Sequence, residues 1–179
     1  MNVIHVDMPM LDTWNQPCFP LASAILGSIS KANGLSCLYV EGSRIYSDIC
    51  KMPQEKISIP ERCIDNIFSQ IIAIAPKIIT FSINHWNQGL CYRILDRLFR
   101  SRFSRSKVIL GGPQVTLVYE HLFSFLNERF KDVLNDSLFL GVGEAEVVYE
   151  KFIKNVCASG IADTSNEKFP GGHLKSGHL

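Results

Sequence analysis

Two glycine-rich turns are the segments of this 179-residue chain best suited to hold a ligand. Residues 111–116 read GGPQVT and residues 141–144 read GVGE, and each turn follows a short apolar run. Glycine lets the backbone approach a flat or bulky group closely and leaves N–H groups free for phosphate or amide oxygens. Thr116 and Glu144 can also cap the helices that follow, which is compatible with ligand contact. The turns therefore predict binding chemistry, and we assign no catalytic residue and no metal ligand.

Further polar and aromatic residues lie in two loops that should reach the same edge of the fold. One loop follows an apolar run at 2–7 and the other follows an apolar run at 78–83. A tryptophan ring in such a loop can cover a flat ligand or anchor the loop by packing, and both readings stay open. We interpret His85 as a loop histidine that is solvated or bonded to backbone, not as a metal ligand. The candidate binding residues are Pro9, Trp14, Asn15, Gln16, Ser82, Asn84, Trp86, Gly111, Gly112, Pro113, Thr116, Gly141, Gly143 and Glu144.

The elements that position these loops are five short apolar runs that alternate with five amphipathic segments. The stretch around Pro53 and Pro60 is polar and is expected to be irregular. Because parallel strands need crossover connections that cover the sheet, this order predicts a parallel sheet with helices on both faces. In such sheets ligands bind beyond the carboxyl ends of the strands, near the switch point in strand order. The expected strands are 2–7, 35–41, 78–83, 107–110 and 137–141, and the expected helices are 20–32, 61–75, 90–103, 119–130 and 145–157.

The same loops exclude several common kinds of site. The loop after the first strand has no glycine, so the G-x-G-x-x-G turn of dinucleotide-binding folds is absent and Glu41 is read as a solvated strand end. No aspartate ends the third strand, which excludes a phosphate-receiving domain, and no G-K-S/T triplet forms a P-loop. The six cysteines lie a dozen or more residues apart and never in C-x-x-C spacing, which argues against zinc and iron–sulfur ligation.

The composition predicts a cytoplasmic protein that contacts neither nucleic acid nor membrane. The formal net charge is +1, from 18 basic against 17 acidic residues, so no global field draws the chain to polyanions. A basic run from Arg93 to Lys107 is read as a solvated helix face. The most apolar stretch is broken by Pro76 and Lys77, far short of the roughly 20 residues that cross a bilayer. The N-terminus has no basic region typical of a signal peptide, so the cysteines are expected to be reduced thiols.

The order of these motifs resembles the cobalamin-binding domain of cobalamin-dependent radical S-adenosylmethionine (SAM) proteins. That family shows a proline-containing loop after strand one, F-S-x-x-x-W/x-N after strand three, G-G-P-x-x-T after strand four and G-E-G-E before the last helix. The corresponding residues are Pro9, 81–87 (FSINHWN), 111–116 (GGPQVT) and 141–144 (GVGE). The last two motifs, about 30 residues apart, are the most specific part, and together the four cover nearly the whole globular region. Val142 stands where the family usually has an acid.

The resemblance implies an α/β, flavodoxin-like (Rossmann-like) fold with a five-stranded parallel sheet and helices on both faces. It implies a cobalamin-binding-like domain at 1–158. From about Ser159 the chain is polar, contains glycine and proline and shows no periodicity, so 159–179 is interpreted as a tail that is disordered or a linker remnant. The family continues into a barrel with a C-x-x-x-C-x-x-C cluster site, a spacing that the six cysteines lack. The chain is therefore expected not to cleave SAM by itself. It is read as a fragment, a truncated gene product or a stand-alone corrinoid module without a complete catalytic apparatus.

The resemblance also implies that cobalamin is held base-off, without a protein histidine on cobalt. Methionine-synthase-type domains supply an axial histidine from D-x-H-x-x-G after strand one, whereas residues 12–17 (DTWNQP) contain no histidine. The open lower face of the corrin would then meet Trp14, and the nucleotide tail would run beside 111–116 and 141–144. The iron–sulfur cluster and SAM would belong to a missing domain or to a radical SAM barrel partner, in a methyltransferase-type system.

Two other classes of function stay open beside this one. A vestigial or regulatory α/β module that no longer binds corrin would work through protein contacts. It would show a ligand edge that is closed or filled by the tail, and an exposed apolar patch elsewhere. A small nucleotide- or flavin-binding protein is the third class, which the loops support least.

Overall fold

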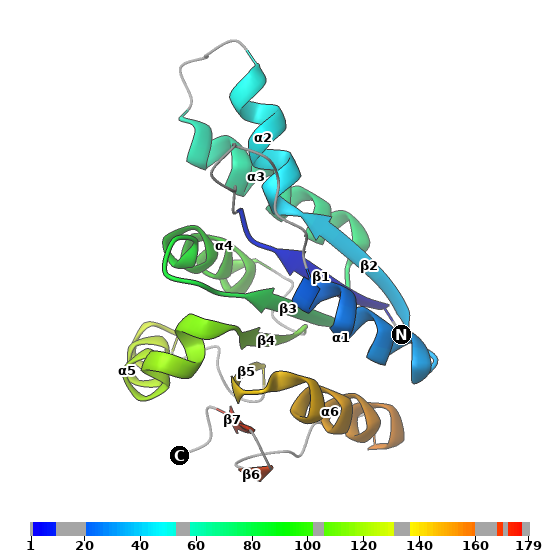
Figure 1. The fold of residues 1–179 in the computed structure, drawn as a ribbon. Coiled ribbons are helices and arrows are strands. Elements are labelled where there is room, and N and C mark those ends of the chain that lie inside the picture. Colours follow the sequence, from blue (N-terminus) through cyan, green and yellow to red (C-terminus); the bar gives the residue numbers. More distant parts are fainter. Residues whose placement is uncertain are drawn as a thin grey trace.

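One sheet with helices on both faces organises the computed structural model, which describes residues 2–9, 21–52, 58–101, 106–130, 137–159, 168–169 and 172–176 (Figure 1). The strands are β1 (Asn2–Asp7), β2 (Ser36–Glu41), β3 (Ile78–Ser82), β4 (Lys107–Gly111), β5 (Leu138–Gly143), β6 (Lys168–Phe169) and β7 (Gly172–Ser176). The helices are α1 (Leu21–Ala32), α2 (Gly42–Lys51), α3 (Ile59–Ile74), α4 (Gln88–Arg100), α5 (Pro113–Arg129) and α6 (Ala145–Ser159). The predicted flavodoxin-like α/β class is confirmed.

The strand order is β2-β1-β3-β4-β5-β7-β6, and the first five of these strands run parallel. After β1 the chain adds β2 on one side, then crosses back and adds β3, β4 and β5 on the other side. The order therefore switches between β1 and β3. In sheets of this kind a ligand crevice opens at the carboxyl ends of the strands near that point.

Two cores lie on opposite faces of the sheet because successive side chains of a strand point to opposite sides. Ile4, Val6 and Phe81 pack with buried residues of α2, α3, α4 and α5. Val3 and Ile78 pack instead with residues of α6, and Leu26 and Ile29 of α1 lie against that cluster. Strands buried on both faces explain the near-continuous Val and Ile runs in the sequence.

Helix α2 corrects the sequence-based expectation that the region after β2 is irregular. It covers Gly42–Lys51 and buries Ser43, Ser47 and Ile49. The helix was not predicted because serines occupy much of its buried face, so Ile45 and Ile49 alone give too weak a helical spacing of apolar residues.

Helix α5 also begins earlier than expected, at Pro113 instead of residue 119. Proline suits a first helical turn because its missing N–H has no helical acceptor there. The backbone at Val118 departs from helical angles, with φ −126° and ψ 27°, so the first turn and the regular segment meet at a kink. The segment between residues 113 and 118 is therefore helical although it carries little apolar periodicity.

Part of the tail at 159–179, expected to be without regular structure, forms strands. Strand β7 pairs antiparallel with β5 from Phe139 to Gly143, and β6 pairs antiparallel with β7. The expectation of a disordered or linker tail is wrong for these two segments. They add two strands to the sheet beyond the five that were predicted. The division between a domain at 1–158 and a tail at 159–179 stays a prediction.

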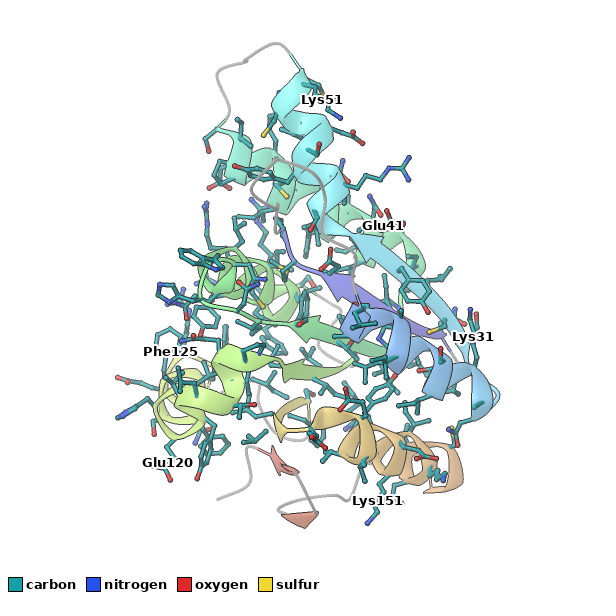
Figure 2. The ribbon with its side chains drawn as sticks, in the orientation of Figure 1. Lys31, Glu41, Lys51, Glu120, Phe125 and Lys151 are labelled. Atoms are coloured by element: carbon teal, nitrogen blue, oxygen red, sulfur yellow. The ribbon has the colours of Figure 1, made fainter. Side chains whose placement is uncertain are left out.

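Charged side chains of both signs are spread over the outer surface, and Figure 2 shows Lys51, Glu120 and Lys151 pointing away from the sheet. Part of the basic run on α4 is paired with α3. Arg93 forms an ion pair with Glu61, and Arg97 forms ion pairs with both Glu61 and Asp65. In the described segments, no helix is both long and apolar enough to cross a membrane.

A candidate ligand pocket at the carboxyl edge of the sheet

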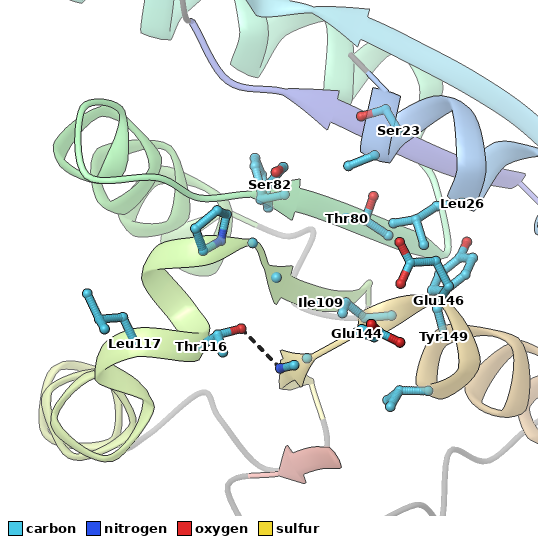
Figure 3. Close-up of a pocket in the computed structure, with 18 residues that line it drawn as sticks. Ser23, Leu26, Thr80, Ser82, Ile109, Thr116, Leu117, Glu144, Glu146 and Tyr149 are labelled. Atoms are coloured by element: carbon cyan, nitrogen blue, oxygen red, sulfur yellow. Dashed lines mark hydrogen bonds between the residues drawn. The ribbon is translucent and has the colours of Figure 1, made fainter. Parts of the chain in front are cut away.

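A pocket of about 530 Å³ lies between the sheet, α1, α6 and the first turn of α5 (Figure 3). Its floor is made by alternate residues near the carboxyl ends of the strands, Thr80 and Ser82 of β3 and Ile109 and Gly111 of β4, with Gly141 of β5 beside them. Because these positions face α1 and α6, the pocket is on the sheet face opposite the larger core. It lies one strand from the switch point, where the topology places a ligand.

Two helices form the side walls. Ala22, Ser23 and Leu26 come from α1, and Val148 and Tyr149 come from α6. No side chain projects from Gly111 or Gly141, so a flat group can lie directly on the sheet between these walls. The pocket is more apolar than polar at its walls and floor, as small-molecule sites usually are.

The first glycine-rich turn is held by backbone contacts that require glycine. Gly112 has φ 106°, and a Cβ at this position would come within 2.6 Å of the Ile83 carbonyl oxygen. The Ile83 N–H donates to the Gly111 carbonyl oxygen (2.7 Å), and the Gln114 N–H donates to the Ile83 carbonyl oxygen (3.2 Å). These bonds join the ends of β3 and β4 and place Pro113 at the pocket wall.

Thr116 connects the two glycine-rich turns. Its Oγ1 accepts a hydrogen bond from the Gly143 backbone N–H at 3.0 Å (Figure 3). Gly143 also has φ 82°, a conformation that glycine adopts freely. The turns that the sequence placed 30 residues apart, at Gly111–Thr116 and Gly141–Glu144, thus form one rim of the pocket.

The residues predicted after β3 lie in a loop that is ordered by its own side chains. Asn84 Oδ1 accepts from the backbone N–H groups of Trp86 (2.9 Å) and Asn87 (3.0 Å), and Asn87 Oδ1 accepts from the Asn84 N–H (3.0 Å). The Trp86 side chain is 80% exposed and its ring lies 5.3 Å from the His85 ring. Neither Asn84 nor Trp86 is among the described residues that line the pocket.

The remaining predicted binding residues fall into three groups: those that line the pocket, one that is buried elsewhere, and those outside the described residues. The pocket brings together Ser82, Gly111, Gly112, Pro113, Thr116, Gly141, Gly143 and Glu144. Pro9 is buried elsewhere, beside Gly42 at the start of α2. Trp14, Asn15 and Gln16 fall outside the described residues. Val142, which stands in place of the usual acid, is buried in the core on the opposite sheet face.

Sequence reasoning missed the inner part of the pocket. Thr80 lies within an otherwise apolar strand and Tyr149 lies on the buried face of α6, and the sequence analysis singled out neither of them. The signal that could have found them is polarity inside a buried strand. His5 of β1 and Thr80 of β3 are paired in register, and buried polar side chains need partners.

His5 is fully buried between β2, β3, α1 and α6. Its Nδ1 lies 2.7 Å from Thr80 Oγ1 and its Nε2 lies 3.5 Å from Ser30 Oγ. The ring also lies near the rings of Tyr39 and Tyr149, at 5.7 and 5.8 Å. Burial lowers the pKa of His5 to about 4, so the ring is neutral at physiological pH.

This burial predicts a stability that falls in mild acid. Between pH 6.5 and about 4 the unfolded chain binds a proton at His5 and the folded chain does not, so stability falls as the pH is lowered through this range. The expected loss is roughly 3 kcal/mol. Asp7 acts in the opposite direction, because burial raises its pKa and the folded chain binds its proton more readily.

Urea unfolding followed by circular dichroism at pH 7 and pH 4.5 measures this loss. The His5→Gln variant isolates the histidine from Asp7, and His85→Gln is the matched exposed-histidine control. The same pH dependence in wild type and His5→Gln would refute the assignment.

The rim of the pocket carries more hydrogen-bond acceptors than donors among its charged side chains. Glu144 and Glu146 line it, and none of the described lining residues is basic. The described residues contain no cluster of His, Cys, Asp and Glu that could hold a metal ion. The arrangement thus favours a largely apolar ligand with amide or amino donors over one with several phosphates.

The comparisons with known proteins bear on the fold. Neither a family model nor a curated protein matches the sequence. Among solved structures, the chain is similar to a cobalamin-dependent S-adenosylmethionine radical enzyme, OxsB, solved with aqua-cobalamin bound. The TM-score is 0.63 at 17% identity, and the match covers 99% of this chain and 22% of that chain. The likeness is one of fold. The chain spans about a fifth of the length of that structure.

Proposed function

We propose that the pocket holds the nucleotide tail of a cobalamin whose corrin ring lies over the carboxyl edge of the sheet. The observation that carries the proposal is a largely apolar pocket floored by Gly111 and Gly141, bounded by α1 and α6, and open at the edge where the topology places a ligand. A flat aromatic base can lie against the backbone at Gly111 and Gly141, where no side chain projects. The fold shared with a cobalamin-dependent enzyme supports the choice of ligand.

The rim fits the outer groups of a corrin. The ring carries neutral amide side chains, whose N–H groups can donate to the Glu144 carboxylate and whose oxygens can accept from backbone N–H groups at the starts of α5 and α6. Leu117, 78% exposed beside the pocket, offers apolar contact to the ring. The same rim gives a multiply phosphorylated nucleotide little charge to pair with.

We propose further that the cofactor is bound base-off and that no histidine of the described residues ligates cobalt. Both ring nitrogens of His5 face hydroxyl groups inside the core, and His85 does not line the pocket. Bound cobalamin would supply a cobalt centre that carries a methyl group or takes part in a radical step. This chain would hold the cofactor, and a radical SAM barrel would supply the iron–sulfur cluster and the cleavage of SAM.

Retention of hydroxocobalamin tests the proposal. The purified chain is incubated with hydroxocobalamin, desalted, and its visible spectrum recorded against the protein concentration. We expect close to one corrinoid per chain, with a base-off spectrum. A colourless protein fraction would overturn the proposal, and a base-on spectrum would overturn the binding mode.

A further inference from the structure

The inner end of the pocket is polar, although it is closed off from solvent. Thr80 of β3 and Tyr149 of α6 line it with exposures of 4% and 2%, whereas Leu117 at the mouth is 78% exposed. Figure 3 shows both side chains near Leu26, on the far side of the pocket from Leu117. A group that enters the pocket therefore ends against two hydroxyl-bearing side chains.

The direction of the hydrogen bonds behind Tyr149 is set by α1. The Ser30 hydroxyl donates to the Leu26 carbonyl oxygen at 3.0 Å, and a carbonyl can only accept. A serine hydroxyl has a single proton, and we assign it to this carbonyl, which makes Ser30 the acceptor at its 2.6 Å contact with Tyr149. The Tyr149 hydroxyl therefore gives its proton to Ser30 and keeps its lone pairs.

The same serine is the basis for assigning the tautomer of His5. At the 3.5 Å contact Ser30 then has no proton left to give, so we assign the hydrogen of the neutral ring to Nε2 of His5, the tautomer that nitrogen-15 spectra test directly. A neutral imidazole then has a bare Nδ1, which can only accept. Thr80 lies 2.7 Å from this atom and therefore donates its proton to it. The Thr80 hydroxyl, like that of Tyr149, is left with lone pairs.

We infer that Thr80 and Tyr149 present only hydrogen-bond acceptors to the inner end of this pocket and so select a ligand whose inserted ring carries an N–H donor. This inference rests on the proposed function. For a corrinoid it means preference for a lower base with an exocyclic amino group, such as adenine, over 5,6-dimethylbenzimidazole. The latter offers only methyl groups and a ring nitrogen lone pair, which would meet the lone pairs of Thr80 and Tyr149.

The expected preference follows from one hydrogen bond. An amino group that donates to Thr80 or Tyr149 gains a neutral bond, whereas the benzimidazole leaves those acceptors unmatched. The affinity for an adenine-containing cobamide is then expected to exceed that for cobalamin by about three- to tenfold. Glu146, which lines the pocket near Tyr149, adds to the acceptor character (Figure 3).

Titration of the full chain with cobalamin and with adeninylcobamide measures this preference. The Thr80→Val variant keeps the shape of the side chain and removes the oxygen, and it should bring the two affinities to within about twofold. The Thr80→Ser variant keeps the hydroxyl and should retain the preference. Ser30→Ala releases the Tyr149 proton and should also reduce the preference. Ser28→Ala, an exposed serine with the same bond to a carbonyl four residues earlier, is its matched control.

The tautomer of His5 provides a readout that is independent of corrinoid. Nitrogen-15 spectra of the histidine-labelled protein at pH 7 should show a protonated Nε2 and a bare Nδ1. A protonated Nδ1 would reverse the bond to Thr80 and overturn the inference. Equal binding of the two cobamides would overturn it while leaving the proposed function intact. Binding of neither would reject the proposed function, and the inference would fall with it.

Discussion

Replacing Ala22 with tryptophan is expected to lower the affinity for cobalamin about a hundredfold. Ala22 lines the pocket from the first turn of α1 and is exposed, so a larger side chain can enter the pocket without displacing the core. An aromatic base buries about 150 Å², and at about 25 cal/mol per Å² its exclusion costs up to about 4 kcal/mol. Part of this is offset by the ordering that binding requires, which leaves roughly 3 kcal/mol. Titration followed by absorbance measures the change.

Ile25→Trp is the matched control, since Ile25 lies one turn further along the same helix, is 37% exposed and is not among the described lining residues. Its affinity for cobalamin should stay within about threefold of wild type. Equal affinities in Ala22→Trp and wild type would show that the ligand does not enter this pocket.

Replacing Gly112 with alanine is expected to destabilise the fold by about 3 kcal/mol. Two costs combine: a φ of 106°, which side chains rarely adopt, and a Cβ within 2.6 Å of the Ile83 carbonyl oxygen and 2.9 Å of its nitrogen. Both contacts are with backbone, so neither can be relieved by rotating a side chain. Urea unfolding at pH 7 followed by circular dichroism measures the loss.

Gly34→Ala separates the two costs. Gly34 also has a positive φ, 75°, but a Cβ there would meet nothing within 4 Å. Gly34→Ala should therefore cost only the strain of a left-handed backbone, about 1 kcal/mol of the free energy of unfolding. A Gly112→Ala variant no less stable than Gly34→Ala would contradict the close packing of the turn between β3 and β4.

The sequence predicted the sheet because buried parallel strands leave a plain signature. Runs such as 78–83 are mainly apolar, and the amphipathic segments between them are long enough to cross over the sheet. Helix α2 was harder to predict because Ser43 and Ser47 occupy its buried face. The pairing of β7 with β5 depends on contacts made far apart in the sequence, which no local pattern encodes.

The candidate pocket was predictable only at its two glycine-rich turns. Its glycines follow strands, and all parallel strands end at one edge, so Gly111 and Gly141 had to come close together. Thr80 and Tyr149 are polar residues on elements that are otherwise core, and their role depends on which side of the sheet they face. Trp86 was predicted from its loop alone, and the loop directs it to solvent.

The comparison of cobalamin with cobinamide, which has the corrin ring but no nucleotide tail, tests the central claim most directly. Both are titrated against the full chain under the same conditions, and the dissociation constants are compared. If the tail occupies the pocket between α1, α6 and the sheet, cobalamin should bind at least about tenfold more tightly, because only cobalamin buries an aromatic base there. Equal dissociation constants would show that the pocket does not receive the nucleotide tail and would contradict the account.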